Sequence, residues 1–209
     1  MNKRVIGVVL LLMLTMCVSI SVGYAESELN GYDQSLLFYL PFEGTMDDAT
    51  GRTVVEVHGD VSFADDGCCG SQCAYFDGDG DYLDLGTGFN FHDNFTVSVW
   101  VKSESETRSD AALLAKYETN GYGPYDFYLS KNRPAIWISN GKGRYTKDLA
   151  CSTIDNQWHM VTWTYQKSAR RYTAYVDGVE DRMIVLDHDL TANDDHVTIG
   201  RQAFMFAPH

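Results

Sequence analysis

The sequence predicts an all-β fold, an antiparallel β-sandwich of the jelly-roll type. Short segments rich in β-branched and aromatic residues follow one another along the chain and are separated by turn-forming residues. A second observation is the stretch 158–179, in which two strand-like arms are followed by an Asp-Gly turn. The chain has 209 residues, which suits one domain with a sizeable core.

The predicted strands share high β propensity and flanking Gly, Asp or Asn residues. Only 110–117 also allows a helix. In chain order the strand candidates are Leu36–Phe42, Val54–Val57, Ala74–Phe76, Tyr82–Leu85, Phe95–Val101, Ala112–Lys116, Phe127–Leu129, Ala135–Ile138, the two arms within 158–179, and Val197–Ile199.

The two arms are Trp158–Tyr165 and Tyr172–Val179. Successive strand residues point to opposite faces of a sheet, so Val161, Trp163 and Tyr165 share one face. We expect this apolar face to contact the core. The opposite face, which begins at Met160, is left for solvent or for a ligand.

The N-terminal segment has the pattern of a secretory signal. Lys3 and Arg4 precede the apolar run 5–20, and small residues lead to a cleavage-like site after Ala25. A membrane anchor needs about 20 apolar residues, more than this run offers. Lipid attachment at Cys17 is disfavoured because Met16 is not small. We therefore expect a secreted or cell-surface protein in which 1–25 is a signal peptide, 26–33 a short leader and 34–209 the sandwich.

The chain is acidic, with a formal net charge of −13 at pH 7. Nucleic acid is excluded as a partner because its affinity comes largely from basic residues that neutralise phosphates. The same argument excludes direct binding to an anionic membrane surface. An acidic secreted protein can bind calcium, a cation that takes oxygen ligands. Acidity that only maintains solubility is the alternative.

Four cysteines follow the signal segment, and an even number in a secreted chain indicates disulfides. We expect one cysteine of the group 68–73 to pair with Cys151 and the other two to close a small loop. A zinc site is the alternative, although the spacing of the thiols is a weak zinc signal. The candidates are Cys68, Cys69, Cys73 and Cys151.

Several motifs, in this order, resemble the laminin G-like family within the concanavalin A-like lectin and glucanase superfamily. They cover most of the chain after the signal: Leu40-Pro41-Phe42-Glu43-Gly44, Ala74-Tyr75-Phe76-Asp77-Gly78, Phe95-Thr96-Val97-Ser98-Val99-Trp100, Gln157-Trp158-His159, Tyr175-Val176-Asp177-Gly178 and Thr198-Ile199-Gly200. The resemblance implies a β-sandwich that binds carbohydrate or an extracellular protein, because this fold carries lectins, adhesion modules, pentraxins and glycosidases.

The enzymatic interpretation has little support. Glycosidases of this superfamily resemble one another in carrying Glu-x-Asp-x-x-Glu, or a near variant, on one strand, which places acid and nucleophile on the same face of the sheet. This chain lacks that run. A Gly-x-Ser-x-Gly elbow is also absent. We expect a non-catalytic binding module. A glycosidase or polysaccharide lyase with dispersed catalytic residues is the alternative, and a structural module of a larger surface protein is the third possibility.

Two acidic clusters are candidate calcium ligands. Asp77, Asp79 and Asp81 place carboxylates at alternate positions of a glycine-rich turn. Many laminin G-like domains hold calcium, and the resemblance implies that the second cluster lies near the first strand and consists of Glu43, Asp47 and Asp48. The alternative is that Asp and Gly act here only as turn formers.

A third candidate site is a surface that binds sugar. Aromatic rings stack on the apolar faces of sugars, while carboxylates and amides bind the hydroxyl groups. Such residues are interleaved in a glycine-containing segment and just beyond it. The candidates are Tyr117, Asn120, Tyr122, Tyr125, Asp126 and Tyr145. Trp137 is expected in the core because it lies in an alternating strand.

The resemblance also implies a closing strand of the form Asp-Glu-Val-x-Ile-Tyr after Gly200, next to the first strand. The sequence after Gly200 does not contain it. We therefore expect a sandwich that lacks its closing C-terminal strand, so that the strand Leu36–Phe42 has an unpaired edge.

Overall fold

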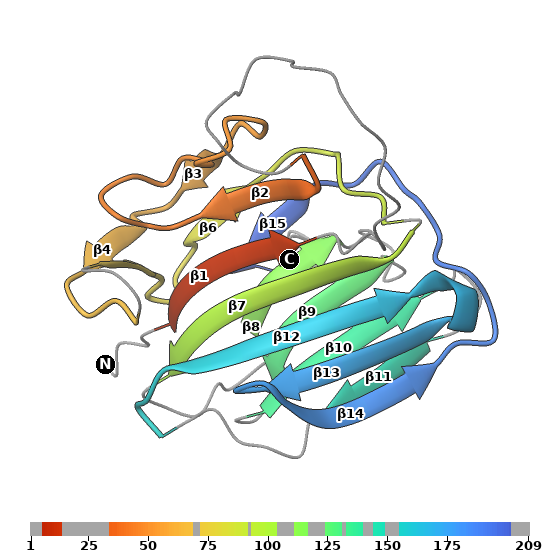
Figure 1. Cartoon of the computed structure of the whole chain (residues 1–209). Helices are drawn as coiled ribbons and strands as arrows, with labels where there is room; N and C mark the ends of the chain where they lie inside the picture. The colour runs from red at the N-terminus through yellow and green to blue at the C-terminus, as the bar shows by residue number, and fades with distance from the viewer. Residues whose placement is uncertain are drawn as a thin grey trace, which may run out of the picture.

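A computed structural model describes residues 6–13, 34–68, 72–91, 93–103, 111–116, 124–130, 133–139, 144–148 and 155–201. Two antiparallel sheets stack face to face in these residues (Figure 1). This arrangement confirms the predicted all-β sandwich. Among the described residues, no helix has the length and apolar character that a membrane crossing requires.

Sheet A has eight strands, and seven of them follow the spatial order β14-β13-β12-β7-β1-β5-β4, with β2 paired to β1. Their bounds are β1 Ile6–Met13, β2 Leu36–Leu40, β4 Ser62–Ala64, β5 Cys73–Tyr75, β7 Phe95–Ser103, β12 His159–Gln166, β13 Arg171–Val176 and β14 Val179–Val185.

Sheet B has seven strands in the order β11-β10-β9-β8-β15-β6-β3. Their bounds are β3 Glu56–His58, β6 Tyr82–Asp84, β8 Ala111–Lys116, β9 Tyr125–Ser130, β10 Arg133–Ser139, β11 Arg144–Asp148 and β15 Val197–Ile199. The segment 111–116, for which the sequence also allowed a helix, is a strand. Its neighbours β9 and β15 hold it in the sheet.

The core fills the space between the two sheets. Alternate residues of β7 are buried, from Phe95 to Val101, and they face Val161 and Trp163 of β12. Trp163 is fully buried, and its ring centroid lies 4.9 Å from that of Phe127 in sheet B. The predicted inward face of this arm is therefore confirmed.

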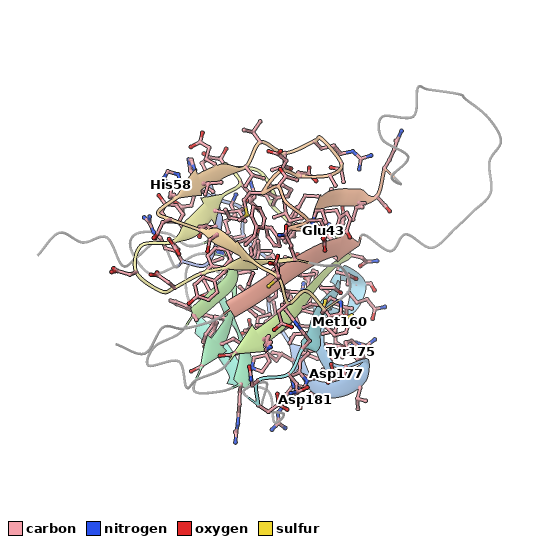
Figure 2. The ribbon with its side chains drawn as sticks, turned by 90° about the vertical axis from the view of Figure 1, so that its left-hand side faces the viewer. Glu43, His58, Met160, Tyr175, Asp177 and Asp181 are labelled. Atoms are coloured by element: carbon pink, nitrogen blue, oxygen red, sulfur yellow. The ribbon has the colours of Figure 1, made fainter. Side chains whose placement is uncertain are left out.

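The predicted Asp-Gly turn joins β13 to β14. Asp177 and Gly178 both have positive φ, 52° and 78°, as the tight hairpin turn requires. Figure 2 shows Met160, Tyr175 and Asp177 together on the sheet A side of the sandwich. The backbone N–H of Asp177 donates to the Met160 carbonyl at 2.9 Å, which ties the turn to β12.

Strand β1 lies in the middle of sheet A, between β7 on one side and β2 and β5 on the other (Figure 1). The sequence analysis treated 1–25 as a removed signal and did not anticipate this strand. Strand β2 pairs with β1 in the full chain. The unpaired edge was expected for a chain without residues 1–25, so it stays a prediction. The sequence predicts that no closing strand follows Gly200. Residues 202–209 lie outside the described part of the chain, so this stays a prediction.

Of the cysteine candidates, the structure describes Cys68 and Cys73. Cys73 has a free thiol that is 2% exposed, and its sulfur lies 3.7 Å from the Ala64 carbonyl oxygen. Burial raises the pKa of this thiol, and the nearby Asp66 carboxylate adds to the shift. Cys73 therefore forms no bridge here. Cys69 and Cys151 lie outside the described residues, and the disulfide pairing stays a prediction.

Candidate functional site

The outer face of sheet B, which points away from the core, carries aromatic and acidic side chains from several strands. Its floor is set by β9 and β10, where Asp126 pairs with Trp137 and Tyr128 pairs with Ala135. Residues directly opposite in antiparallel strands share a face. Tyr128, Ala135 and Trp137 form a cluster separate from the inter-sheet core. Trp137 is 7% exposed, so its expected buried position is confirmed, although its cluster lies on the outer face and not between the sheets.

The row that starts at Trp137 continues across the sheet. Asp126 pairs with Ala115, Ala115 with Thr198, and Thr198 with Asp84. Asp84 pairs in turn with Glu56 at the edge strand. The register therefore brings residues from six strands into one line, although they are spread along the sequence from position 56 to position 198.

A second row lies beside the first, displaced by two residues: two residues later in β3 and two residues earlier in the antiparallel strand β6. Tyr82 pairs with His58, and their rings stack with centroids 4.2 Å apart. The guanidinium carbon of Arg201 lies 3.9 Å from the centre of the Tyr82 ring, a distance typical of a cation–π contact. Thr198 donates its hydroxyl proton to the Arg201 carbonyl at 2.6 Å, which fixes the chain at this point.

Exposure changes along the first row. Asp126 is fully buried and Thr198 is 5% exposed, whereas Asp84 is partly exposed and Glu56 is exposed. His196 lies beside Asp84, with Nδ1 2.7 and 2.8 Å from the two carboxylate oxygens. This end of the row, made of Glu56, Asp84 and His196 with the stacked His58 and Tyr82, is called the open end below.

A cavity of about 300 Å³ adjoins the open end. This volume is at the lower limit of small-molecule sites. The wall combines charged groups with apolar surface from the chain around β3 and β6. The lining residues are Arg52, Thr53, Val54, Glu56, Asp84, Leu85, Gly86, Gly88, Phe89 and His196.

A buried lysine holds one wall of this cavity. Lys116 is fully buried, and its Nζ donates to the carbonyl oxygens of Thr87 and Gly88 at 2.6 Å each. Burial lowers the pKa of Lys116 to about 8, while the carboxylates of Asp195 and Asp194 act in the opposite direction. The adjacent Phe89 has a positive φ of 59°, an unfavourable conformation for this residue type. Lys116 therefore positions a strained loop.

The predicted sugar-binding residues fall into different places. Tyr125 is 1% exposed and belongs to the core, where its hydroxyl donates to the Phe89 carbonyl at 2.9 Å. Its proposed ligand contact was wrong, because the strand phase turns this side chain inward. Asp126 lies on the outer face. Tyr117, Asn120 and Tyr122 lie outside the described residues, and only the backbone of Tyr145 is described, paired with Ile138.

The first acidic cluster is partly assembled. Asp77 and Asp81 come together with Asp60, and one carboxylate oxygen from each lies within 4.8 Å of the others. Asp81 is 4% exposed and accepts the backbone N–H groups of Asp60 at 2.8 Å and Asp77 at 3.1 Å. Asp79 does not join this group, and its backbone N–H donates to Asp77 at 2.7 Å.

The second acidic cluster does not converge on one point. Asp48 is 5% exposed, and its two oxygens accept bonds from the backbone and from the Thr50 hydroxyl. Asp47 accepts from the Thr45 hydroxyl, and Glu43 accepts from the Gln72 backbone N–H at 3.3 Å. The carboxylate of Asp48 thus acts as a turn former, as the alternative interpretation held.

A laminin G family model, described as the concanavalin A-like lectin/glucanases superfamily, matches residues 77–208, more than half of the chain. The chain belongs to this superfamily. The resemblance seen in the sequence motifs is therefore confirmed. No curated protein matches the chain.

Solved structures show the same fold at low sequence identity. The receptor-binding domain of botulinum neurotoxin mosaic serotype C/D is 14% identical with a TM-score of 0.60, over 76% of this chain and 40% of that chain. Domain 4 of AbnA, an extracellular arabinanase from Geobacillus stearothermophilus, solved with arabinotriose, is 18% identical with a TM-score of 0.57, over 73% and 76%. Domains LG4-5 of the mouse laminin α1 chain are 20% identical with a TM-score of 0.47, over 57% and 31%. The chain therefore spans less than half the length of the toxin and laminin chains.

None of the open end was predicted from the sequence: Glu56, His58, Tyr82, Asp84 and His196 were not among the candidate site residues. One signal was present, since Tyr82 and Asp84 alternate with the apolar Leu83 and Leu85 in a predicted strand. That alternation indicates a polar outer face, but it does not identify the residues that pair beside it.

Proposed function

We propose that the chain is a secreted, non-catalytic module that binds carbohydrate at the open end of sheet B. The observation that carries this proposal is the juxtaposition of the stacked His58 and Tyr82 rings with the carboxylates of Asp84 and Glu56. The Tyr82 ring lies between His58 and Arg201, so within this stack it is the His58 ring that can offer a surface to the C–H face of a sugar. The carboxylates beside it accept hydrogen bonds from sugar hydroxyls. The adjoining cavity has room for part of such a ligand.

A solved structure of similar fold supports the ligand class. Domain 4 of AbnA was solved in complex with arabinotriose, and its fold is similar to that of this chain over 73% of this chain's length. An extracellular protein is the alternative ligand. It is favoured by the exposed apolar side chains Val54 and Val57 near the same edge, which are 81% and 47% exposed.

A glycan array with the full chain tests the proposal, and Asp84→Asn is the informative variant. Hydrogen bonds to charged groups contribute roughly 1.5–3 kcal/mol, so we expect at least about tenfold weaker binding. The matched control is Asp189→Asn, which removes an exposed carboxylate that pairs with Arg170 at 2.9 Å on the other sheet. We expect wild-type binding from this control.

Three outcomes contradict the proposal. Equal binding by wild type and Asp84→Asn moves the ligand away from the open end. New reducing ends or unsaturated sugar products from a bound glycan make the protein an enzyme. An array without any bound glycan, together with a partner captured from extracellular protein, favours the alternative ligand. Secretion is part of the proposal, and N-terminal sequencing of protein from the culture medium tests cleavage after Ala25.

A calcium ion remains part of this proposal, and Asp60, Asp77 and Asp81 are the described residues that would hold it. Calcium binds oxygen ligands at about 2.3–2.6 Å, so two ligands of one ion lie at most about 5 Å apart. The spacing within 4.8 Å fits this limit. An ion there would hold the turn before β6 and thereby the strand that carries Asp84. A melting temperature that does not respond to calcium or EDTA would remove the ion from the proposal.

A further inference from the structure

A small cavity lies on the outer face of sheet A, where β12 ends and β13 begins. Its volume is about 180 Å³. Tyr172 and Ala174 of β13 belong to the core, so the alternate residues Thr173 and Tyr175 point outward. Figure 2 shows Tyr175 on this side of the sandwich. The residues that give the cavity its polar and aromatic character are Asn94, Thr164, Gln166, Arg171, Thr173 and Tyr175.

The floor of this cavity is built from residues that are directly opposite each other in the two strands. Thr164 pairs with Thr173, and Gln166 pairs with Arg171. Because such pairs share one face of a sheet, two hydroxyls, an amide and a guanidinium lie side by side. The strand register therefore assembles a polar site that is distinct from the open end of sheet B.

Thr173 contributes a buried hydroxyl that lacks a hydrogen-bond partner among the described residues. The residue is 7% exposed and borders the cavity. The hydroxyl of Thr164 donates instead to the backbone carbonyl of Thr173, at 3.4 Å. A buried polar group without a partner costs free energy, so a ligand that hydrogen-bonds to this hydroxyl removes a cost that the free protein carries.

Arg171 supplies the positive charge of the cavity. Its guanidinium donates to the side-chain carbonyl of the neutral Gln166 at 2.7 Å and forms no ion pair with the described residues. The nearby Asp93 already pairs with Lys167 at 2.9 Å. None of the described residues that line the cavity is acidic. An arginine that has no carboxylate partner, in a chain with a net charge of −13, is available to a carboxylate from outside.

We propose that this cavity is a second binding site, which takes the carboxylate of a sugar acid. The guanidinium of Arg171 binds the carboxylate through paired N–H groups, and Gln166 holds the guanidinium in place. The Thr173 hydroxyl bonds to a hydroxyl group of the sugar, and the Tyr175 ring borders its C–H face.

The charge and the size of the cavity define the ligand further. One guanidinium balances one negative charge, so a carboxylate fits better than a doubly charged phosphate. Pockets for drug-sized ligands have volumes of about 300 Å³ or more, so this cavity has room for a single sugar residue. That residue is either a free sugar acid or the terminal residue of a glycan.

Titration of the full chain with glucuronate, followed by amide NMR, tests the proposal. We expect binding with a dissociation constant on the order of 1 mM and amide shifts centred on Thr164, Arg171 and Thr173. Glucuronamide, which has the same shape without the charge, should bind at least about tenfold more weakly.

Two variants and one matched control complete the experiment. Arg171→Gln should weaken glucuronate binding at least about tenfold, and Thr173→Val, which removes only the hydroxyl, about fivefold. The control is Arg182→Gln, which removes an exposed cation from the adjacent strand β14, outside the cavity, and should bind as wild type does. Circular dichroism verifies that each variant is folded.

Equal affinity for glucuronate and glucuronamide, or for glucuronate in wild type and Arg171→Gln, would overturn the proposal. Amide shifts confined to β3 and β6 would also overturn it, because they would place the acid at the open end. Inorganic phosphate that competes as well as glucuronate would refute the assignment to a carboxylate. The methyl glycoside of glucuronate separates the two sources: its binding supports a terminal glycan residue, and binding of the free acid alone supports a free sugar acid.

Discussion

The turn that follows β2 depends on one carboxylate, and Asp48→Asn is the substitution that tests it. One oxygen of Asp48 accepts the backbone N–H groups of Tyr39 at 2.9 Å and Thr50 at 3.0 Å. The other accepts the Thr50 hydroxyl at 2.6 Å and the backbone N–H groups of Arg52 at 3.1 Å and Thr53 at 2.9 Å. The asparagine keeps the shape but turns an N–H₂ group toward donors.

The expected loss follows from these contacts. Hydrogen bonds to charged groups contribute roughly 1.5–3 kcal/mol each, and a buried donor without a partner costs about 1–3 kcal/mol. We expect Asp48→Asn to lower the free energy of unfolding by about 3 kcal/mol. In a chain of 150–250 residues each kcal/mol corresponds to roughly 2–4 °C, so the melting temperature should fall by about 6–12 °C.

The pKa of Asp48 gives an independent check. Burial acts to raise this pKa, but hydrogen bonds from the Thr50 hydroxyl and from backbone N–H groups outweigh it, so the pKa lies below 3.8. A carboxyl with a lowered pKa contributes stability above its unfolded pKa, and the contribution is lost as pH falls through the folded value. The difference between wild type and Asp48→Asn should therefore shrink in strong acid.

Thermal unfolding by circular dichroism at pH 7, with and without calcium, measures the effect. The control is Asp47→Asn, which removes an exposed carboxylate that accepts only from the Thr45 region and should stay within about 0.5 kcal/mol of wild type. An Asp48→Asn chain as stable as this control would refute the reasoning. A loss that appears only in the presence of calcium would make Asp48 a metal ligand.

Two further predictions concern pH. Both nitrogens of His159 face carboxylates, Asp177 at 2.8 Å and Asp155 at 3.1 Å, and these raise its pKa although burial opposes them. Its contribution to stability is present below the unfolded value of 6.5 and is lost as pH rises through the folded value, so His159→Gln should flatten the stability profile there. Lys116 behaves in the opposite sense, because burial lowers its pKa to about 8. The melting temperature should rise between pH 8 and pH 10, and Lys116→Met should abolish that rise; an unchanged slope in either variant contradicts the corresponding assignment.

The sequence correctly predicted the strands in which the alternation of apolar and polar residues matches the two faces that the strand has in the sandwich. In the arm 158–165, β-branched and aromatic residues alternate with smaller polar ones, and the strand β12 forms there with the expected inward face. The turn at Asp177-Gly178 was equally predictable, because it needs positive φ at both positions and few residue pairs allow this.

Other strands have no local pattern and depend on their neighbours. Strand β11, Arg144–Asp148, consists almost entirely of polar residues and pairs with β10 over five positions. Strand β4, Ser62–Ala64, pairs only with β5 among the described strands. Whether such segments form strands depends on their position in the sheet and not on β propensity alone.

The candidate site, too, could not be predicted from the local sequence pattern. The line from Trp137 to Glu56 exists only because the registers of the successive strand pairs agree. Apart from Ala115, each of its residues, taken alone, is a polar or aromatic residue in the outward phase of a strand. Residues that cluster along the chain, as in the segment 117–126, are visible in the sequence, whereas residues brought together by strand register are not.

Burial along that line separates the residues that can touch a ligand from those that support them. Asp126 and Trp137 are 0% and 7% exposed, so a sugar in solution cannot reach them without movement of the chain. Asp84 and Glu56 are accessible, and Asp84 is held by His196 at 2.7 Å. A carboxylate fixed in this way loses little side-chain entropy on binding, which favours it as a specific contact. Under the proposed function the buried end therefore supports the row from within the sheet, and the open end is the surface that would contact a ligand.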